Sequence, residues 1–470
     1  MRRFRYGFFP LAVLLAAGCT LSTGPQYAEK NETAVVPVPQ AHAAKREDAS
    51  VAAACNREEP ADLRELPQTA APYLARVRER RNILPVQRRY RTEYYRVWAD
   101  GYRPDPPEKV RWPFRTYTAE DAYGENLRPL PPSWFDGMRK EADWKAYNSV
   151  GEPAIALRRL DLRNFPTRKP LFHDPCKAGE GFPFDYLQNS AVFANEPLYL
   201  SHYSADKAWA YVLTSYATGW VPADAIAVVN ARQRKALESR PLIALLEEER
   251  PLYTRRGDYL FRARIGMLLP LEREDGTAWT ADAVIEGGVR RSRVIPVTLP
   301  KRAAAKVPMR FTAENIGSVL DGIIGKPYGW GGLYGDRDCS AMIRDIFAPF
   351  GIWLPRNSFQ QSQVGKVVSL EGLDDAAKAA KIRNEAVPFE TLLYLKGHIM
   401  LYLGVYGGEP VVLHTVWGIK TVRDDGSFGR HIVGKTVITT LEFGKELPGY
   451  RPENSLLRKL VSMNLLLTEE

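Results

Sequence analysis

The chain has 470 residues, of which 45% are hydrophobic and 26% are charged. This composition is that of ordinary globular protein, and it excludes a wholly disordered chain and a membrane protein with many spans. At about 100 to 200 residues per domain, the length predicts three or four domains. The net charge is +10 without a dense basic run, which suits an anionic surface such as a cell wall; we expect no nucleic-acid partner.

The first residues predict an export signal. Arg2, Arg3 and Arg5 precede the apolar stretch FFPLAVLLAA, which is too short to span a bilayer, and AAGC follows. This start resembles a bacterial lipoprotein signal, which implies that residues 1–18 are removed and that Cys19 carries the lipid. The protein is then anchored in a membrane of the cell envelope, facing the periplasm. A soluble secretory signal with a chance cysteine is the alternative.

The cysteine count predicts an unpaired thiol. Besides Cys19 the chain has Cys55, Cys176 and Cys339. Exported proteins usually pair their cysteines, and a bridge between Cys55 and Cys176 is one possible pairing. Three cysteines leave at least one unpaired, which marks a candidate reactive thiol.

The pattern along the chain predicts a multidomain α+β protein. Residues 19–60 are rich in Ala, Pro and Thr without an apolar period, which is typical of a flexible tether. Residues 61–150 form a mostly helical piece broken by prolines, with one helix starting at Ser133. Short alternating strands over 151–230 resemble a bacterial SH3 domain, and 231–305 is a more divergent second SH3-like barrel. Residues 306–470 are a separate α+β domain, whose first helix has Thr312 as its cap.

The C-terminal domain carries the candidate chemistry. Cys339 follows Asp338 at the start of a predicted helix, where the helix N-terminus and a nearby imidazolium lower the pKa of a thiol. Glycines in PYGWGGLYG leave the backbone open, so that a substrate approaches the sulfur. His398 begins one predicted strand as the candidate base, and His414 ends its partner strand as the residue that orients the base. A buried structural cysteine and a Cys/His/His zinc site are the alternatives.

Five motifs in this order resemble the NlpC/P60 family of cell-wall cysteine peptidases, which has a papain-like fold. They are PYGWGG (327–332), DCSA (338–341), LPRNSFQQ (354–361), GHIMLYLG (397–404) and VLHTV, which contains His414. The resemblance implies that Cys339 is the nucleophile, His398 the base and His414 the orienting residue. It also implies that Tyr328 donates to the oxyanion beside the Cys339 amide.

The resemblance further implies a substrate pocket. Its residues are Trp330, Asp338, Asn357 and Ser358, with Asp185 or Tyr186 of the first SH3-like domain reaching in. Ser358 and Asn357 accept the amino end of the stem peptide. Some relatives have an acidic residue where this chain has Asn357, so a preference for a free amino end is in doubt.

The expected activity is hydrolysis of the γ-D-glutamyl to diamino acid bond of peptidoglycan stem peptides. Peptidoglycan stem peptides and the membrane are the expected partners of a monomer that needs no cofactor and no metal. Two alternatives are a non-catalytic wall-binding lipoprotein and a different acyl-transfer reaction on the same fold.

Overall fold

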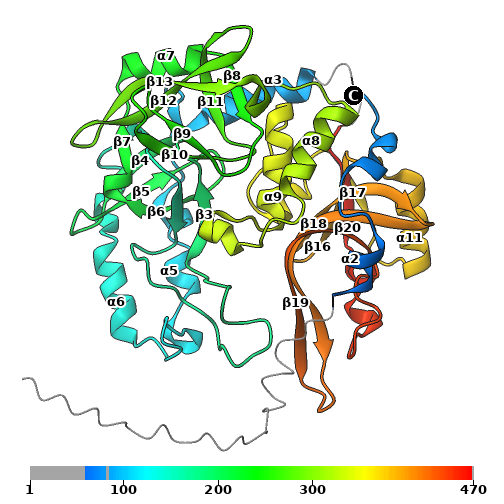
Figure 1. The fold of residues 1–470 in the computed structure, drawn as a ribbon. Coiled ribbons are helices and arrows are strands. Elements are labelled where there is room, and N and C mark those ends of the chain that lie inside the picture. Colours follow the sequence, from blue (N-terminus) through cyan, green and yellow to red (C-terminus); the bar gives the residue numbers. More distant parts are fainter. Residues whose placement is uncertain (1–58, 81–83, 468–470) are drawn as a thin grey trace, which may run out of the picture. The chain divides into compact units, whose positions relative to one another are not determined.

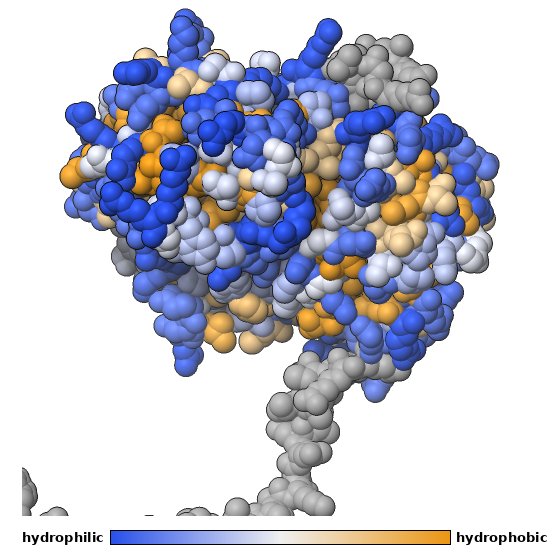
Figure 2. Space-filling model, turned by 45° about the horizontal axis from the view of Figure 1, so that its top comes forward, coloured by the Kyte–Doolittle hydropathy of each residue, from blue (hydrophilic) through white to orange (hydrophobic). Residues whose placement is uncertain are grey.

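The computed structural model describes residues 59–80 and 84–467 (Figure 1). The predicted lipidation site Cys19, the tether up to residue 58 and Cys55 lie outside these residues. Cys176 is an exposed free thiol, and Cys339 is a buried one. In the described part of the chain, no helix is long and apolar enough to cross a bilayer. On the face drawn in Figure 2, hydrophilic residues cover most of the surface and apolar residues form patches between them.

A six-stranded antiparallel sheet organises the C-terminal domain, in the order β15-β20-β16-β17-β18-β19. Its strands are β15 (Lys366–Ser369), β16 (Thr391–Leu395), β17 (His398–Tyr406), β18 (Glu409–Val422), β19 (Phe428–Thr440) and β20 (Ser462–Leu465). The helices of the domain are α8 (Ala313–Ile323), α9 (Cys339–Phe347), α10 (Ser358–Gln361), α11 (Asp375–Glu385) and α12 (Leu456–Lys459).

The alternation of strand residues buries both faces of this sheet. Leu392 of β16 and Leu413 of β18 point into a core shared with α8 and α9. Leu393 and Val412, one position away, point into a second core shared with α11. Figure 1 accordingly shows α9 and α11 on opposite sides of the strands. Helix α9, which begins at Cys339, is thus held by a packed layer.

Two features of this domain test the sequence expectations. Thr312 caps α8, as predicted, by accepting a hydrogen bond from the Asn315 amide. The prediction that His414 ends its strand is wrong, because β18 continues to Val422. The ladder with β19 extends past His414 as far as the pair Val422 and Phe428, so backbone hydrogen bonding sustains the strand.

Both SH3-like units contribute to one 12-stranded sheet. The first unit contains β1 (Glu152–Ala156), β2 (Leu160–Arg163), β3 (Gln188–Val192), β4 (Pro197–Tyr203), β5 (Trp209–Leu213), β6 (Thr218–Pro222) and β7 (Ile226–Val228). After α7 (Ala231–Ser239), the second contains β8 (Leu242–Leu245), β9 (Arg250–Tyr253), β10 (Tyr259–Ala263), β11 (Leu268–Glu274), β12 (Ala278–Gly288), β13 (Arg291–Pro300) and β14 (Ala304–Lys306). Strands β9 and β10 pair with each other in a separate two-stranded sheet. Within the 12-stranded sheet, one parallel bridge between Val228 and Arg291 joins the two units, and each unit has its own apolar core.

Four of the N-terminal helices pack on the first SH3-like unit. They are α3 (Leu84–Tyr94), α4 (Pro107–Val110), α5 (Pro113–Thr116) and α6 (Pro132–Glu141). The first described helix, α2 (Ala61–Glu65), packs on the C-terminal sheet instead. The buried Trp98 indole donates to the carbonyls of Ala154 and Leu198, at 3.0 and 2.9 Å. The predicted start of a helix at Ser133 is wrong by one residue. Pro132 is the first helical residue, and its fixed φ and missing N–H suit that position.

The segment around α2 covers the edge of the C-terminal sheet. β19 is an edge strand, and Gln68 exchanges hydrogen bonds with both backbone groups of Ile438. Asp62 accepts from the amide and the hydroxyl of Thr440, at 2.6 and 2.9 Å. These contacts satisfy edge groups that otherwise pair with another chain.

Candidate active site

Cys339 is the first residue of α9, as predicted. Asp338 is the helix cap, and its Oδ1 accepts from the Ala341 amide at 2.8 Å. The other carboxylate oxygen accepts from the Gly331 amide at 3.1 Å. One carboxylate therefore fixes the helix start and the glycine loop together.

Two glycines of this loop pack closely against the first SH3-like unit. A Cβ on Gly331 lies 2.5 Å from the Gln188 carbonyl oxygen, and a Cβ on Gly332 lies 2.6 Å from the Ala191 Cβ. Both neighbours belong to β3 of the first SH3-like unit. These two glycines thus let the protein's own strand approach, a role that the sequence did not predict. Their φ angles of +57° and +88° also favour glycine.

The two predicted histidines are hydrogen-bonded to each other. His398 Nε2 lies 2.8 Å from His414 Nδ1, and His414 Nε2 lies 3.1 Å from the Thr439 hydroxyl. That hydroxyl donates its proton to the Thr440 carbonyl at 2.9 Å, so toward His414 it accepts. His414 is then protonated on Nε2 and accepts on Nδ1 from His398.

This chain of donors determines the tautomer of the candidate base. His398 carries its proton on Nε2, so its Nδ1 keeps a free lone pair. The Cys339 sulfur lies beside the backbone amide of Ile399, the residue after His398. A neutral imidazole with a free Nδ1 is the form that accepts a thiol proton. Thr439 was missed from the sequence because a single threonine in a strand has no distinguishing pattern.

Burial opposes ionisation of the Cys339 thiol, against the expectation from the helix N-terminus. Burial, and next the charge of Asp338, raise the pKa of Cys339 to about 12. Burial lowers the pKa of His398 to about 4 and holds that of His414 well below its usual value. The prediction of a lowered thiol pKa is therefore wrong for the resting state, because desolvation outweighs the helix dipole. Proton transfer has to accompany the attack of the sulfur.

A cavity of about 560 Å³ lies beside Cys339, and three parts of the chain line it. The C-terminal domain contributes Tyr328 and Trp330. The first SH3-like unit contributes Tyr216, and the N-terminal helical piece contributes Trp112. Sequence reasoning missed Tyr216, in the turn between β5 and β6, and Trp112, in the turn before α5, because both are far from Cys339 in the chain.

The predicted oxyanion and substrate residues take different places around the cavity. No residue in the described part of the chain hydrogen-bonds to the Tyr328 hydroxyl, which leaves it free to donate to an oxyanion. Asn357 and Ser358 line the cavity, and Asn357 also caps α10 by accepting from Gln360. Of the two SH3 candidates, Tyr186 lines the cavity.

Asp185, the other SH3 candidate, does not line this cavity. Arg163 donates to it at 2.6 Å, and the amides of Leu171 and Leu187 each donate at 3.0 Å. Its carboxylate is buried and fully engaged in the SH3-like unit. Its backbone carbonyl still contacts the site, because it accepts from the Trp330 indole at 3.0 Å.

Arg356 supports the segment around Cys339. Its guanidinium donates to both oxygens of Asp338, at 3.0 and 2.7 Å, and also to Ser340 and to Ser190 of β3. Burial alone raises the pKa of Asp338, but this cation holds it below its usual value. The LPRNSFQQ motif contains Arg356, so the sequence offered a signal that was not used.

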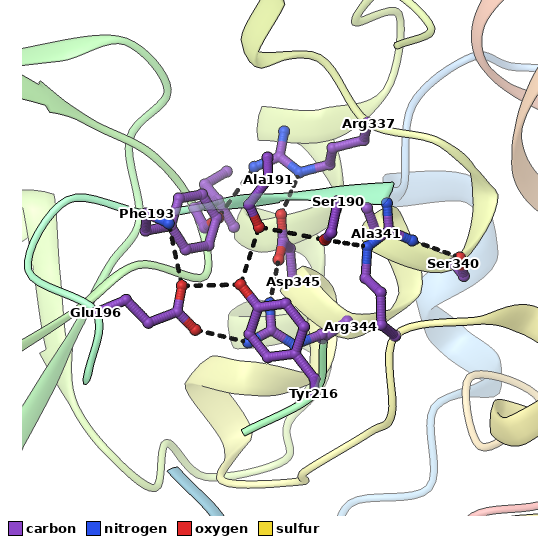
Figure 3. A network of polar contacts seen from close by, with 12 residues as sticks. Ser190, Ala191, Phe193, Glu196, Tyr216, Arg337, Ser340, Ala341, Arg344 and Asp345 are labelled. Carbon is purple, nitrogen blue, oxygen red and sulfur yellow. Dashed lines mark hydrogen bonds and ion pairs between the residues drawn. The ribbon is translucent and has the colours of Figure 1, made fainter. Parts of the chain in front are cut away.

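A buried network joins the far side of α9 to the SH3-like unit (Figure 3). Glu196 lies between Tyr216, whose hydroxyl donates at 3.0 Å, and Arg344 of α9, which donates at 3.1 Å. The Arg344 guanidinium lies 3.6 Å from the centre of the Tyr216 ring. Asp345 of the same helix pairs at 2.7 Å with Arg337, which precedes the helix. The network thus fixes the cavity wall and α9 to one another.

Comparisons with known proteins agree with this arrangement. Residues 325–432 match the NlpC/P60 family. The chain carries an NlpC/P60 domain. Upstream, residues 8–147 match the N-terminal NLPC_P60 stabilising domain, 170–222 an SH3 domain of the SH3b1 type and 230–276 an SH3 domain of the SH3b2 type. The matches confirm the predicted family and the mixed α and β fold class.

The chain is similar to a curated protein and to a solved structure. A gamma-D-glutamyl-L-lysine dipeptidyl-peptidase of Bacillus subtilis (strain 168) is 32% identical over 124 residues, which are 26% of this chain and 39% of that relative. The chain thus matches about two fifths of the relative's length. A solved NlpC/P60 endopeptidase from Photobacterium damselae subsp. piscicida is 24% identical, with a TM-score of 0.75 over 86% of this chain and 97% of that one. It shares the fold across the domains.

In the described part of the chain, no group of three His, Cys, Asp or Glu side chains is arranged to hold a metal ion. The two histidines direct their facing nitrogens at each other.

Proposed function

We propose that the protein is a cysteine endopeptidase that hydrolyses the γ-D-glutamyl to diamino acid bond of peptidoglycan stem peptides. The observation that carries the proposal is the donor chain from His398 to Thr439, which leaves a free lone pair on His398 Nδ1 in the site of a buried thiol. That arrangement supplies the base that the neutral Cys339 needs.

Acylation follows from these groups. The Cys339 sulfur attacks the carbonyl carbon of the γ-glutamyl amide while its proton moves to His398 Nδ1. The oxyanion takes hydrogen bonds from the Cys339 amide and the Tyr328 hydroxyl. The C–N bond then breaks, and His398 returns the proton to the departing amine of the diamino acid. The product is a thioester on Cys339.

Deacylation restores the enzyme. His398 Nδ1 accepts a proton from water as the water oxygen attacks the thioester carbonyl, and the C–S bond breaks. The sulfur leaves as a thiolate and takes the proton from His398. Throughout, His414 accepts from His398 Nε2 and stabilises the imidazolium, the role of the third residue in such triads.

Two observations support the substrate class. The Bacillus subtilis relative is named for a γ-D-glutamyl-L-lysine bond, and lysine is also a diamino acid. The amide and hydroxyl side chains of Asn357 and Ser358 suit hydrogen bonding to a peptide end. The cavity offers a substrate amine no free carboxylate, because Asp338 is the only carboxylate that lines it among the described residues and Arg356 already pairs with it.

Mass spectrometry of digested muropeptides tests the proposal. Wild-type protein is expected to release fragments that end in γ-D-glutamate, and Cys339→Ala is expected to release none. Cys176→Ala, which removes the exposed thiol, is the matched control and keeps full activity. Identical fragments from Cys339→Ala refute the proposal, and products extended by an added amine indicate acyl transfer instead.

We also propose that Cys19 is lipidated and anchors the protein in the cell envelope. The support is the signal-like start of the sequence that precedes AAGC. Labelled fatty acid is expected to appear in the wild-type protein and not in Cys19→Ser, which then fractionates away from membranes. Equal labelling of both proteins contradicts the proposal.

A further inference from the structure

A second cavity of about 460 Å³ lies between the first SH3-like unit and the glycine-rich loop. It shares no lining residue with the cavity beside Cys339. The same two segments of the chain nevertheless contribute lining residues to both cavities. Tyr186 and Gly331 line the catalytic cavity, whereas Asp185 and Tyr334 line the second one. A long substrate that leaves the catalytic cavity is thus close to the second.

Positive charge dominates the second cavity. Arg158, Arg159 and Arg168 line it, and Arg163 lies buried with its charge paired to Asp185. Arg159 pairs with Asp161, and Arg158 reaches the exposed Asp224 at 3.1 Å. Arg159 also donates to the Gly332 carbonyl and is held in place. The pair of Arg158 and Asp224 is exposed, and such a pair is weak and readily exchanged for a ligand.

Arg168 is the most available of these arginines for a ligand. It is exposed, and among the described residues no carboxylate or other partner engages it. A guanidinium is suited to forked hydrogen bonds with a carboxylate.

Two exposed aromatic rings stand at the same cavity. Phe182 is 62% exposed and Tyr334 is 73% exposed, with their ring centres 6.4 Å apart. Tyr334 also has a φ of +59°, a conformation that a bulky residue rarely adopts. The fold thus holds a strained residue with its ring in water. Strain of this kind is typical of functional sites, and neighbouring exposed rings are typical of binding surfaces.

We propose that this cavity is a second, non-catalytic binding site for peptidoglycan. The arginines take the carboxylates of a stem peptide, and Tyr334 with Phe182 stacks on an adjacent sugar ring. This inference rests on the proposed function only for the identity of the polymer. Bound there, one strand of the wall keeps a neighbouring stem beside Cys339.

Sedimentation with purified sacculi tests the site, using the full-length Cys339→Ala protein so that nothing is cleaved. Arg168→Ala and Tyr334→Gly are each expected to weaken binding about tenfold, since a charge-assisted hydrogen bond or a stacked ring is lost. Arg255→Ala removes an equally exposed arginine outside the cavity and is expected to stay within twofold of the parent.

Tyr334→Gly separates a binding effect from misfolding. Glycine accepts a positive φ without strain, so the variant is expected to melt no lower than the parent while it binds less. With Cys339 intact, Tyr334→Gly is also expected to cleave a short soluble stem peptide at the wild-type rate.

Two results overturn the inference: parental binding by both variants, or binding to vesicles of anionic lipid as tight as that to sacculi. Failure of the proposed function is a different result, in which the short peptide is not cleaved and sacculus binding is unaffected.

Discussion

Replacing Thr439 with valine tests the donor chain behind the catalytic base. Valine has nearly the same shape but cannot accept from His414 Nε2, which is fully buried. An unsatisfied buried donor costs about 1–3 kcal/mol. His414 therefore moves its proton to Nδ1 and donates to His398 Nε2. His398 then carries its proton on Nδ1 and cannot accept one from the thiol.

The size of the effect follows from that penalty. A penalty of about 2 kcal/mol raises the activation free energy by that amount. Because every 1.36 kcal/mol lowers the rate tenfold, kcat is expected to fall about 30-fold. KM is expected to stay within about twofold of wild type, because Thr439 does not line the cavity. Alkylation of Cys339 by iodoacetamide is expected to slow in parallel with kcat.

Steady-state kinetics on a soluble stem peptide measures both constants. Thr439→Ser, which keeps the hydroxyl, is the matched control and is expected to retain kcat within about threefold. A Thr439→Val enzyme with wild-type kcat refutes the donor chain. Equal losses in both variants point to a packing effect instead.

Three further predictions concern pH, the buried network and the substrate cavity. Because burial lowers the pKa of His398 to about 4, the acid limb of kcat/KM is expected near pH 4; a limb near 6.5 contradicts the burial argument. The unfolded chain takes up protons on His398 and His414 below about pH 6.5, so the melting temperature is expected to fall as pH drops from there. Glu196→Gln leaves Arg344 without its closest counter-charge and is expected to lower the free energy of unfolding, measured with denaturant, by about 3 kcal/mol. Asp136→Asn, in an exposed pair, is the control and is expected to lower it by under about 1 kcal/mol. Equal losses in the two variants argue against the network. Asn357→Asp adds an unpaired carboxylate to the cavity and is expected to lower KM about tenfold for a stem peptide with a free amino end but not for its N-acetylated form; no difference between the two substrates places the amino end elsewhere.

Much of the fold was accessible from the sequence because local patterns encode it. The alternation in GHIMLYLGVYGGEPVVLHTV predicted two paired strands, and they form β17 and β18. The sequence did not predict the end of a strand where that end depends on a neighbouring strand. β18 extends beyond His414 because β19 pairs with it, and no local feature of β18 reveals that partner.

The candidate site divides in the same way. Cys339, His398 and His414 were identifiable because their chemistry restricts which residue types serve and their order follows a known motif. The roles of Gly331 and Gly332 were not identifiable. Both lie against β3, more than 130 residues earlier in the chain, and only folding brings these segments together.

The sequence by itself determined the chemical groups of this protein: a thiol at a helix start, two histidines on paired strands and a tyrosine in the preceding loop. The tertiary structure alone decided their protonation and their surroundings. Burial shifts the thiol and imidazole pKa values, Thr439 sets the histidine tautomers, and Tyr216 and Trp112 line the cavity. These properties depend on desolvation and on contacts between distant segments, which exist only once the chain has folded.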